Sequence, residues 1–176
     1  MGLTFTVRTA SIDELPLPGE DPDVFVLRMA RDKAAEVSRQ FPDVWVISGD
    51  TVVCLGRRIL GKPTDKEEAV NLLLELSGRE HSVKTGFCLV HESRKVMIAR
   101  SVTTKVRFAQ LSRSIVQSYV ATGESLDKAG AYGIQGRGGC LVRSIEGSYS
   151  NVVGLPLYEL LEVLLENGVV EPSVLC

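Results

Sequence analysis

Apolar and polar residues alternate at two different periods near the start of the chain. Residues 3–8 alternate one by one, which is the period of a strand with one buried face. Apolar residues then recur at helical spacing over 26–37, after Asp21 as a predicted N-cap and Pro22 at the first helical position. Pro42 follows the end of this helix. The pattern predicts a strand, an acidic and proline-rich loop, and then a helix.

Further strands are predicted from short apolar or β-rich stretches. Residues 44–47 form an apolar run that is expected to end at the Ser-Gly-Asp of residues 48–50, and extended chain continues over 51–55. Residues 81–90 and 96–108 are rich in residues that favour strands, and four polar residues separate them. This is the pattern of a β-hairpin.

Three more helices are indicated by capping residues and by leucine-rich faces. Thr64 and Glu67 form a predicted capping box, and Gly78 ends the helix that follows. An amphipathic helix is predicted over 112–122 and a leucine-rich helix over 156–168. Because strands and helices interleave along the chain, the sequence predicts an α/β fold with a sheet flanked by helices.

Composition narrows the class of protein. The 176 residues carry 20 Lys+Arg against 22 Asp+Glu, a formal net charge of −2, and 44% of them are hydrophobic. A chain of this size can form a single domain, over residues 1–176, without disulfide or metal staples. The slightly acidic balance argues against a nucleic acid polymer as partner. Four scattered cysteines, no signal peptide and no membrane-length apolar run predict a cytoplasmic protein with no membrane partner.

The first candidate for chemistry is the carboxylate that follows the apolar run at 44–47. In an open α/β sheet, a carboxylate at the end of a buried strand lies where ligands usually bind. There Asp50 can hold a divalent cation or act as a base on water. The alternative is that Asp50 accepts hydrogen bonds from backbone N–H groups in a turn. Position alone leaves both interpretations open.

The second candidate is Lys62, which lies in a stretch that resembles a phosphate-binding P-loop. Residues 56–62 match the glycine and lysine positions of that motif, but Pro63 stands where a Ser or Thr hydroxyl would bind Mg²⁺. Proline also lacks the N–H that would help to bind phosphate. The stretch is therefore no P-loop, although Lys62 remains either a phosphate ligand or a solvated turn lysine.

The third candidate is a glycine-dense segment over residues 127–147. Glycines at this density allow the backbone to approach a ligand closely, and they also occur in tight turns of β-rich segments. Gln135 lies between two of these glycines, where its amide could read the edge of a base through hydrogen bonds. Both a ligand site and a set of turns remain open from the pattern.

Several strings, taken in order, resemble the Maf family of nucleoside triphosphate pyrophosphatases. They occupy residues 49–53, 60–63, 76–86, 127–136 and 145–157, so the resemblance extends over nearly the whole chain. It implies an elongated mixed β-sheet flanked by helices, similar to the inosine triphosphatase fold. It also implies hydrolysis of a nucleoside triphosphate to the monophosphate and pyrophosphate. The form of the fourth string resembles the branch that acts on dTTP and UTP.

The resemblance implies a catalytic and a metal role for two carboxylates. Asp50 resembles the general base of the family and also a ligand of the metal. Glu14 resembles an acidic position near that metal. The cofactor that the family implies is a divalent cation, Mg²⁺ or Mn²⁺. A cation of this kind would offset the negative charge of a triphosphate on a slightly acidic protein.

The resemblance implies binding roles for four further residues. Lys33 and Lys62 resemble phosphate ligands of the family, which suits the several negative charges of a triphosphate. Thr51 and Gln135 resemble positions that set the choice of base. The implied partner is therefore a nucleoside triphosphate, and whether the chain forms a homodimer stays open.

Family members also open with a strand, a Ser-x-Ser-Pro-Arg-Arg loop and a helix, and the sequence given begins at the equivalent of the next strand. Arginine binds two phosphate oxygens at once, so a chain without the two arginines is expected to hydrolyse nucleotides weakly. The alternative function is a catalytically impaired nucleotide-binding or regulatory Maf-like protein linked to cell division or septation.

Overall fold

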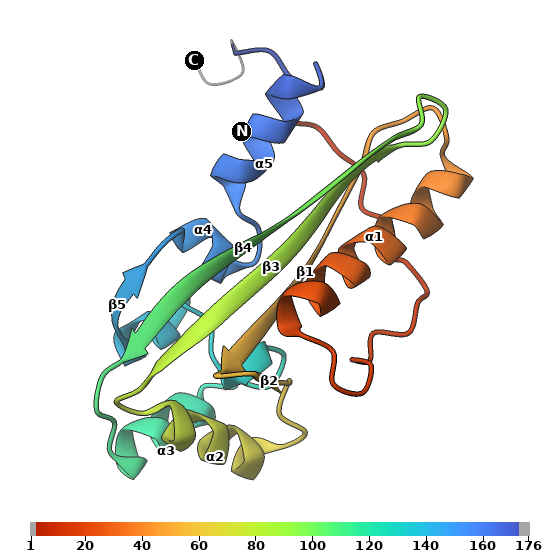
Figure 1. The fold of residues 1–176 in the computed structure, drawn as a ribbon. Helices are drawn as coiled ribbons and strands as arrows, with labels where there is room; N and C mark the ends of the chain where they lie inside the picture. The colour runs from red at the N-terminus through yellow and green to blue at the C-terminus, as the bar shows by residue number, and fades with distance from the viewer. Residues whose placement is uncertain (1–2, 173–176) are drawn as a thin grey trace.

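The computed structural model describes residues 3–172, which form one five-stranded sheet flanked by helices (Figure 1). The strands are β1 (Val46–Leu55), β2 (Arg58–Leu60), β3 (Glu80–His91), β4 (Val96–Phe108) and β5 (Val142–Glu146). Their order in the sheet is β2-β1-β3-β4-β5, and every pair is antiparallel. The α/β class with an elongated, helix-flanked sheet is confirmed, and no parallel pair occurs among the described strands.

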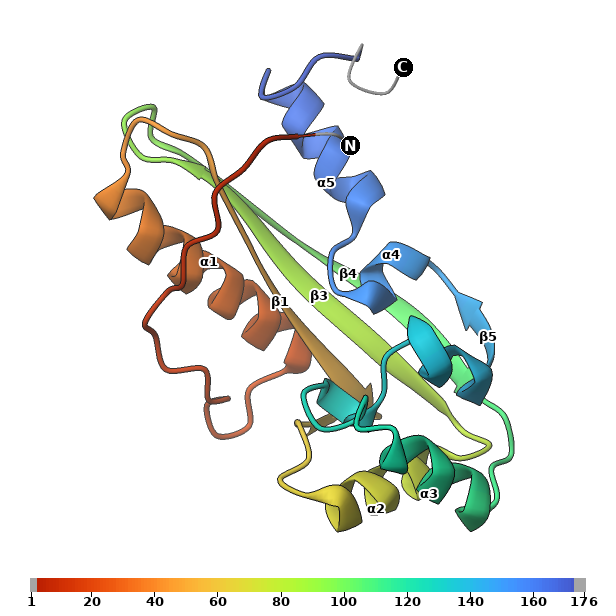
Figure 2. The same ribbon diagram turned by 180° about the vertical axis from the view of Figure 1, so that it is seen from behind.

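Within residues 3–172, five α-helices and two short 3₁₀ turns accompany the sheet. The helices are α1 (Pro22–Gln40), α2 (Lys66–Leu76), α3 (Arg113–Ala121), α4 (Tyr149–Val153) and α5 (Leu157–Glu166). The 3₁₀ turns are η1 (Ala129–Ala131) and η2 (Gly136–Leu141). Figures 1 and 2 show α1 along one face of the long strands, α5 on the opposite side near their upper ends, and α2 and α3 near the lower ends.

The two faces of the sheet follow from the two-residue period of the strands. One set of alternate side chains, including Val52 and Cys54, packs against α1. The other set forms two separate apolar clusters. Val83 belongs to a cluster with α2 and α3, and Phe87 belongs to a cluster with α5. Thr85 lies between these two on β3 and is fully buried, so a polar interval separates the two apolar clusters.

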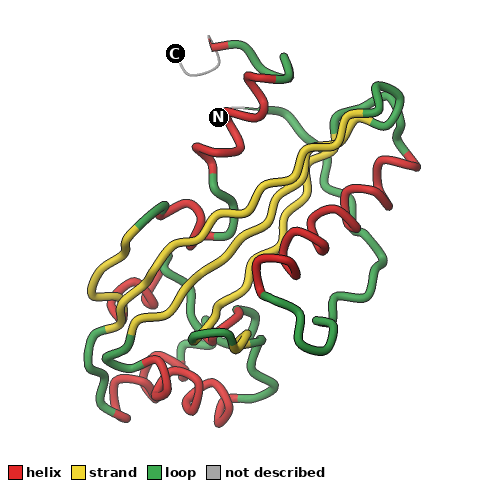
Figure 3. The backbone as a smooth tube through the Cα atoms, viewed as in Figure 1, coloured by secondary structure: helices red, strands yellow, loops and turns green. Residues whose placement is uncertain are grey.

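The predicted strand over residues 3–8 is wrong. Residues 3–21 form an extended segment without strand or helix, drawn as loop in Figure 3. Leu3 packs beside Trp45 and α5, but Phe5 is 78% exposed and Val7 is 75% exposed. An alternating pattern becomes a strand only where a neighbouring strand accepts its hydrogen bonds and an apolar face accepts its side chains. Within the described chain no strand pairs with residues 3–8, and of their alternate apolar side chains only Leu3 packs against an apolar cluster.

The expected break at residues 48–50 is also wrong, because β1 runs through it. These three residues pair in register with Cys88, Phe87 and Gly86 of β3, so Gly49 continues the ladder rather than turning. Gly86 is needed for the packing of α1, since a Cβ atom there would lie 2.2 Å from the carbonyl oxygen of Val26. Long-range pairing therefore overrides the local turn signal of Ser-Gly-Asp.

The start of α2 differs from the predicted capping box by one residue. Asp65 is the N-cap and accepts from the N–H of Glu68 at 2.8 Å, and Glu68 in turn accepts from the N–H of Thr64 at 2.7 Å. Asp and Thr are both good caps, so the sequence alone does not fix the register. The other predicted helices and the hairpin over β3 and β4 are confirmed.

Hydropathy along the described helices gives no membrane span. None of the helices within residues 3–172 is both long enough and apolar enough to cross a bilayer.

Candidate active site

A partly buried cluster of two carboxylates around one ammonium lies beside α1 and β1. The Nζ atom of Lys33 is 2.7 Å from Oδ1 of Asp50 and 2.9 Å from Oε2 of Glu14. The side chains of Asp50 and Lys33 are 13% and 19% exposed, and that of Glu14 is 54% exposed. Three of the predicted site residues are thus brought into contact, and the cluster carries a formal charge of −1.

Three different elements supply this acidic cluster. Lys33 lies in the second half of α1, Asp50 near the middle of β1, and Glu14 on the extended segment before α1. The strand alternation directs Asp50 to the same face as Val52, which is the face that α1 covers. The hydroxyl of Ser48 donates to the carbonyl of Ala30 at 2.5 Å and ties α1 to β1. Asp50 is thus held beside Lys33 and not in a turn.

Burial and charge act on the Asp50 carboxyl in opposite directions. Burial raises its pKa, the hydrogen bond and positive charge of Lys33 lower it, and the sum is a pKa above the ordinary value. Glu14 adds a smaller raising effect as a like charge, and Lys62 adds a smaller lowering effect. Burial also lowers the pKa of Lys33, but its contacts with the two carboxylates more than offset this and raise it. Each member of the pair thus favours the charged form of the other, while burial opposes the charge on both.

A pocket opens on the opposite face of β1. It has a volume of about 300 Å³, near the lower end of the range for small-molecule sites. The lining combines residues from β1, from the glycine-dense segment and from α4. These residues are Thr51, Val53, Lys62, Val83, Asp127, Lys128, Ala129, Tyr132, Gly133, Ile134, Gln135, Val152, Val153 and Gly154. The structure thus places Thr51, Lys62 and Gln135 around one cavity.

The hydroxyl of Thr51 is enclosed by protein groups at the base of this pocket. Its Oγ1 atom is 2.8 Å from Oγ1 of Thr85 and 3.2 Å from the carbonyl oxygen of Gly154. Thr51 and Thr85 are directly opposite each other in the β1–β3 register, and cross-strand threonine pairs commonly hydrogen-bond. Sequence reasoning missed Thr85.

Sequence reasoning also missed Tyr132, which lines the pocket, and its contact with the buried His81. The Oη atom of Tyr132 is 2.7 Å from Nε2 of His81, and both side chains are buried. Burial lowers the pKa of His81 to about 4, so the imidazole is neutral at physiological pH. Gly130 brings the backbone against β1, where a Cβ atom would lie 2.9 Å from a methyl group of Val53. Here the glycine-dense segment forms turns that also shape a pocket.

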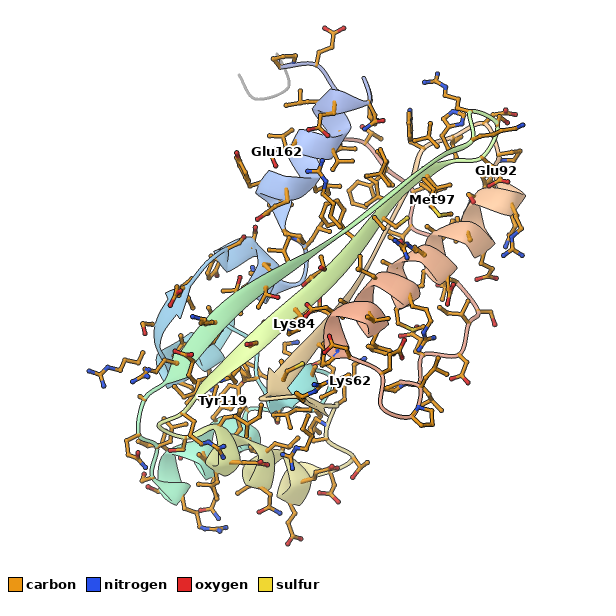
Figure 4. The ribbon with its side chains drawn as sticks, in the orientation of Figure 1. Lys62, Lys84, Glu92, Met97, Tyr119 and Glu162 are labelled. Carbon is orange, nitrogen blue, oxygen red and sulfur yellow. The ribbon has the colours of Figure 1, made fainter. Side chains whose placement is uncertain are left out.

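The acidic cluster and the pocket adjoin each other across β1. Asp50 and Thr51 are consecutive, so their side chains leave opposite faces of one strand. Among the described strands, residues 46–52 of β1 pair only with β3, since β2 reaches no further than Val53. This edge of the sheet connects the two sites. Lys62, labelled near the end of β1 in Figure 4, makes no ion pair within residues 3–172 and lines the pocket.

Comparison with known proteins shows which family the chain is related to. Residues 1–167 match the family described as "Maf-like protein". The chain belongs to the Maf family. A dTTP/UTP pyrophosphatase of Desulfotalea psychrophila is 53% identical over 170 residues, 97% of this chain and 87% of that protein. Proteins with the same name from Myxococcus xanthus and Geobacter metallireducens are 47% and 44% identical, over 98% and 95% of this chain and 86% and 87% of theirs.

The donor set of this Maf chain can be compared with what a divalent cation needs. Within the described residues, no group of three or more His, Cys, Asp or Glu side chains is arranged to hold a metal ion. Glu14 and Asp50 approach each other through their shared contact with Lys33. Mg²⁺ in phosphoryl-transfer sites is commonly held by one or two carboxylates together with substrate phosphates. Glu14 and Asp50 have the oxygen donors for such a shared site, and the ammonium of Lys33 lies between them in the structure.

Proposed function

We propose that this Maf protein hydrolyses dTTP and UTP to the monophosphate and pyrophosphate. The observation that carries the proposal is the pairing, across one strand, of a partly buried carboxylate–lysine cluster with a pocket of small-molecule size. The names of relatives that are 44–53% identical over most of the chain support the choice of substrate. In the reaction, a water oxygen bonds to phosphorus and the α–β phosphoanhydride P–O bond breaks.

Asp50 acts in this proposal as the general base that takes a proton from the attacking water. A carboxylate with an ordinary pKa is a weak base at neutral pH, and burial moves the pKa of Asp50 toward more effective values. Lys33, in contact at 2.7 Å, lowers the pKa of Asp50 and so favours its ionised form against the effect of burial. The two effects together give a base that is charged and more basic than an exposed aspartate.

Lys62 and Lys33 bind phosphate oxygens in this proposal. Lys62 is exposed, lines the pocket and has no carboxylate partner within the described chain, so its charge is available to a triphosphate. Lys33 lies on the other side of β1 beside Asp50. A divalent cation held by Asp50 and Glu14 together with phosphate oxygens would supply further charge neutralisation at the phosphates.

Thr51 and Gln135 read the base in this proposal. Both line the pocket, Thr51 from β1 and Gln135 from the loop before η2. The pocket volume of about 300 Å³ suits a single pyrimidine ring with part of its ribose. A site built on hydrogen bonds rejects an analogue that leaves its buried polar groups unpaired.

We extend the proposal to a cytoplasmic location. Cys54 and Cys88 are buried free thiols, and burial raises the pKa of both to about 11, which keeps them protonated and unreactive. Unpaired cysteines are typical of proteins in a reducing compartment.

The test is release of pyrophosphate from dTTP, UTP, CTP, ATP and GTP with Mg²⁺ or Mn²⁺, using purified protein and an Asp50→Asn control. We expect turnover of dTTP and UTP that requires the metal and that the control lacks. Nucleotide binding without pyrophosphate release would contradict the proposal and favour the impaired, regulatory alternative.

A further inference from the structure

The ammonium of Lys33 occupies the point at which the two carboxylates of the acidic cluster converge. Its Nζ atom is 2.7 Å from Oδ1 of Asp50 and 2.9 Å from Oε2 of Glu14, the range of charge-assisted hydrogen bonds. An ammonium has three N–H donors, so one lysine can bind both carboxylates at once. The extended segment before α1 and strand β1 thus direct one carboxylate oxygen each at the same position, and Lys33 fills it from α1.

A divalent cation shared by Glu14 and Asp50 would need the same oxygens. Mg²⁺ and Mn²⁺ bind carboxylate oxygens more closely than an ammonium does. Two positive groups held against the same pair of oxygens would repel each other strongly at that short range. Lys33 and the cation therefore compete for one pair of carboxylates, and one must leave before the other can bind both.

The side chain of Lys33 is suited to changing partners. A lysine carries its charge on a flexible stem of four carbons with freely turning donors, unlike the rigid fork of arginine. The side chain of Glu14 is 54% exposed, so the cluster is open to solvent on that side. Phosphate oxygens of a bound nucleotide would offer the ammonium new acceptors of the same charge. Its charge would then stay paired while the two carboxylates become available.

We propose that Lys33 is an internal counter-ion that keeps a divalent cation off Glu14 and Asp50 in the free protein, and that nucleotide phosphates admit the cation by drawing the ammonium away. The inference rests on the proposed function, from which it takes the triphosphate and the cation. It goes further by assigning an order to binding: the cation binds weakly without nucleotide and more tightly with it.

The second lysine proposed to bind phosphate does not take part in this competition. Lys62 lines the pocket on the other side of β1 and acts on Asp50 only through its charge. Loss of its charge should therefore change cation binding far less than loss of Lys33, which contacts both carboxylates.

The experiment measures binding of Mn²⁺ to the nucleotide-free protein, from the electron paramagnetic resonance signal of free Mn²⁺. A pH of about 8 limits competition from protons for the carboxylates. Lys33→Met removes the ammonium, and Lys33→Arg keeps a positive charge that can bind both carboxylates. Lys84→Met is the matched control. The side chain of Lys84 is 16% exposed against 19% for Lys33, and it also contacts a carboxylate, Asp23, outside both sites.

We expect Lys33→Met to bind Mn²⁺ at least about 10-fold more tightly than the parent, because two carboxylates lose their shared counter-ion. Lys33→Arg should bind it no more tightly than the parent does. Lys84→Met and Lys62→Met should stay within about 3-fold of the parent, since neither lysine contacts Glu14 or Asp50. Adding Glu14→Gln to Lys33→Met should remove most of the gain and so identify the carboxylates that hold the ion.

The effect of the nucleotide is measured with α,β-methylene UTP, by calorimetry with Mn²⁺ and with EDTA. Coupling between two ligands is reciprocal, so the factor by which Mn²⁺ tightens the analogue equals the factor by which the analogue tightens Mn²⁺. We expect this factor to be at least about 10-fold smaller in Lys33→Met than in the parent, because in the variant the cation no longer waits for the ammonium to leave.

Equal Mn²⁺ affinity in the parent and Lys33→Met, an equal gain in Lys84→Met, or equal coupling in the parent and Lys33→Met would each overturn the inference. Mn²⁺ binding is measured without turnover, which separates this result from the proposed activity. Tighter Mn²⁺ binding by Lys33→Met, in a protein that releases no pyrophosphate, would sustain the inference and overturn the activity. Turnover of UTP with unchanged Mn²⁺ affinity in Lys33→Met would do the reverse. If Lys33→Met does not fold, Lys33→Gln takes its place, because it keeps a hydrogen-bond donor without the charge.

Discussion

The two faces of β1 differ in charge and in how they are built. On the side of α1, the acidic cluster of Glu14, Lys33 and Asp50 is charged and partly buried. On the other side, the neutral hydroxyl of Thr51 lies among neutral hydroxyl and carbonyl groups, in a pocket whose charged lining residues are Lys62, Asp127 and Lys128. One strand separates groups suited to moving a proton from groups suited to recognising a base. Substitutions on the two faces should therefore change different measured quantities.

The largest effect is expected on the charged face. Asp50→Asn should lower kcat for UTP by about 10³-fold, because a general base contributes roughly 10²–10⁴-fold and the amide is nearly the same size. Binding of an α,β-methylene UTP analogue should change little. Single-turnover pyrophosphate release and calorimetry measure the two quantities.

Asp23→Asn is the matched control for this prediction. Asp23 lies on α1 and, like Asp50, contacts a lysine: Lys84 of β3, at 2.5 Å; it belongs to neither site. We expect kcat within about twofold of the parent. Equal losses in both variants would mean that the acidic residues act through packing of α1 and would remove Asp50 from the chemistry.

The next largest effect is expected on the free energy of unfolding. It concerns the packing of α1 against β3, which positions Lys33 beside Asp50. Gly86→Ala should destabilise the fold by about 1–3 kcal/mol, because the added Cβ atom meets the carbonyl of Val26 at 2.2 Å and α1 must move. Gly61→Ala is the control, since nothing lies within 4 Å of its added Cβ atom. Thermal unfolding of both variants measures the difference. Equal melting temperatures would show that α1 tolerates displacement.

The sequence predicted the fold best where the signals are local. Asp21 and Pro22 fix the start of α1, and Ser112 caps α3, because each cap bonds to its own first turn. The break expected at 48–50 fails since the pairing partner of Asp50 is Gly86, far along the chain. Whether a strand continues depends on its pairing with a distant strand, which the local Ser-Gly-Asp tripeptide does not indicate.

The same difference between local signals and long-range contacts applies to the candidate site. The family resemblance named Asp50, but its spacing from Lys33 does not show that the two make contact at 2.7 Å. Nothing in the local pattern around Thr85 indicates that its hydroxyl meets Thr51, because the two threonines are joined only by the β1–β3 register. Contacts made across strands become visible only once the register is known.

A smaller effect is expected on the neutral face. Gln135→Ala should reduce the preference for UTP over ATP and GTP by about 10-fold in kcat/KM, because one or two hydrogen bonds to the base are lost. The preference itself should be at least about 10-fold in the parent. Gln117→Ala, an exposed glutamine on α3 outside the pocket lining, should leave the base profile unchanged. A flat base profile in the parent would contradict the role of Gln135.

The smallest effects are expected in the pH dependence of kcat, which should respond to charged residues near Asp50 and not to Thr51 on the other face of β1. Asp50 must be ionised to accept a proton, so activity is present above its pKa and is lost as the pH falls through it. Lys33 lowers this pKa and Glu14 raises it. Lys33→Met should therefore move the acid limb of the kcat profile to higher pH, and Glu14→Gln should move it to lower pH. Lys62→Met should move it upward by less than Lys33→Met does, because Lys62 acts on Asp50 only through its charge.

Thr51→Val provides the contrast. Its hydroxyl is uncharged and lies on the other face of β1, so its removal does not change the charge near Asp50. It should change the preference among bases and leave the acid limb where the parent has it. Profiles of kcat against pH with saturating UTP, recorded for these variants at constant ionic strength, make the comparison. Shifts of the same sign in Lys33→Met and Glu14→Gln would mean that the limb reports another group. The assignment of the limb to Asp50 would then be wrong, although the recognition face could still stand.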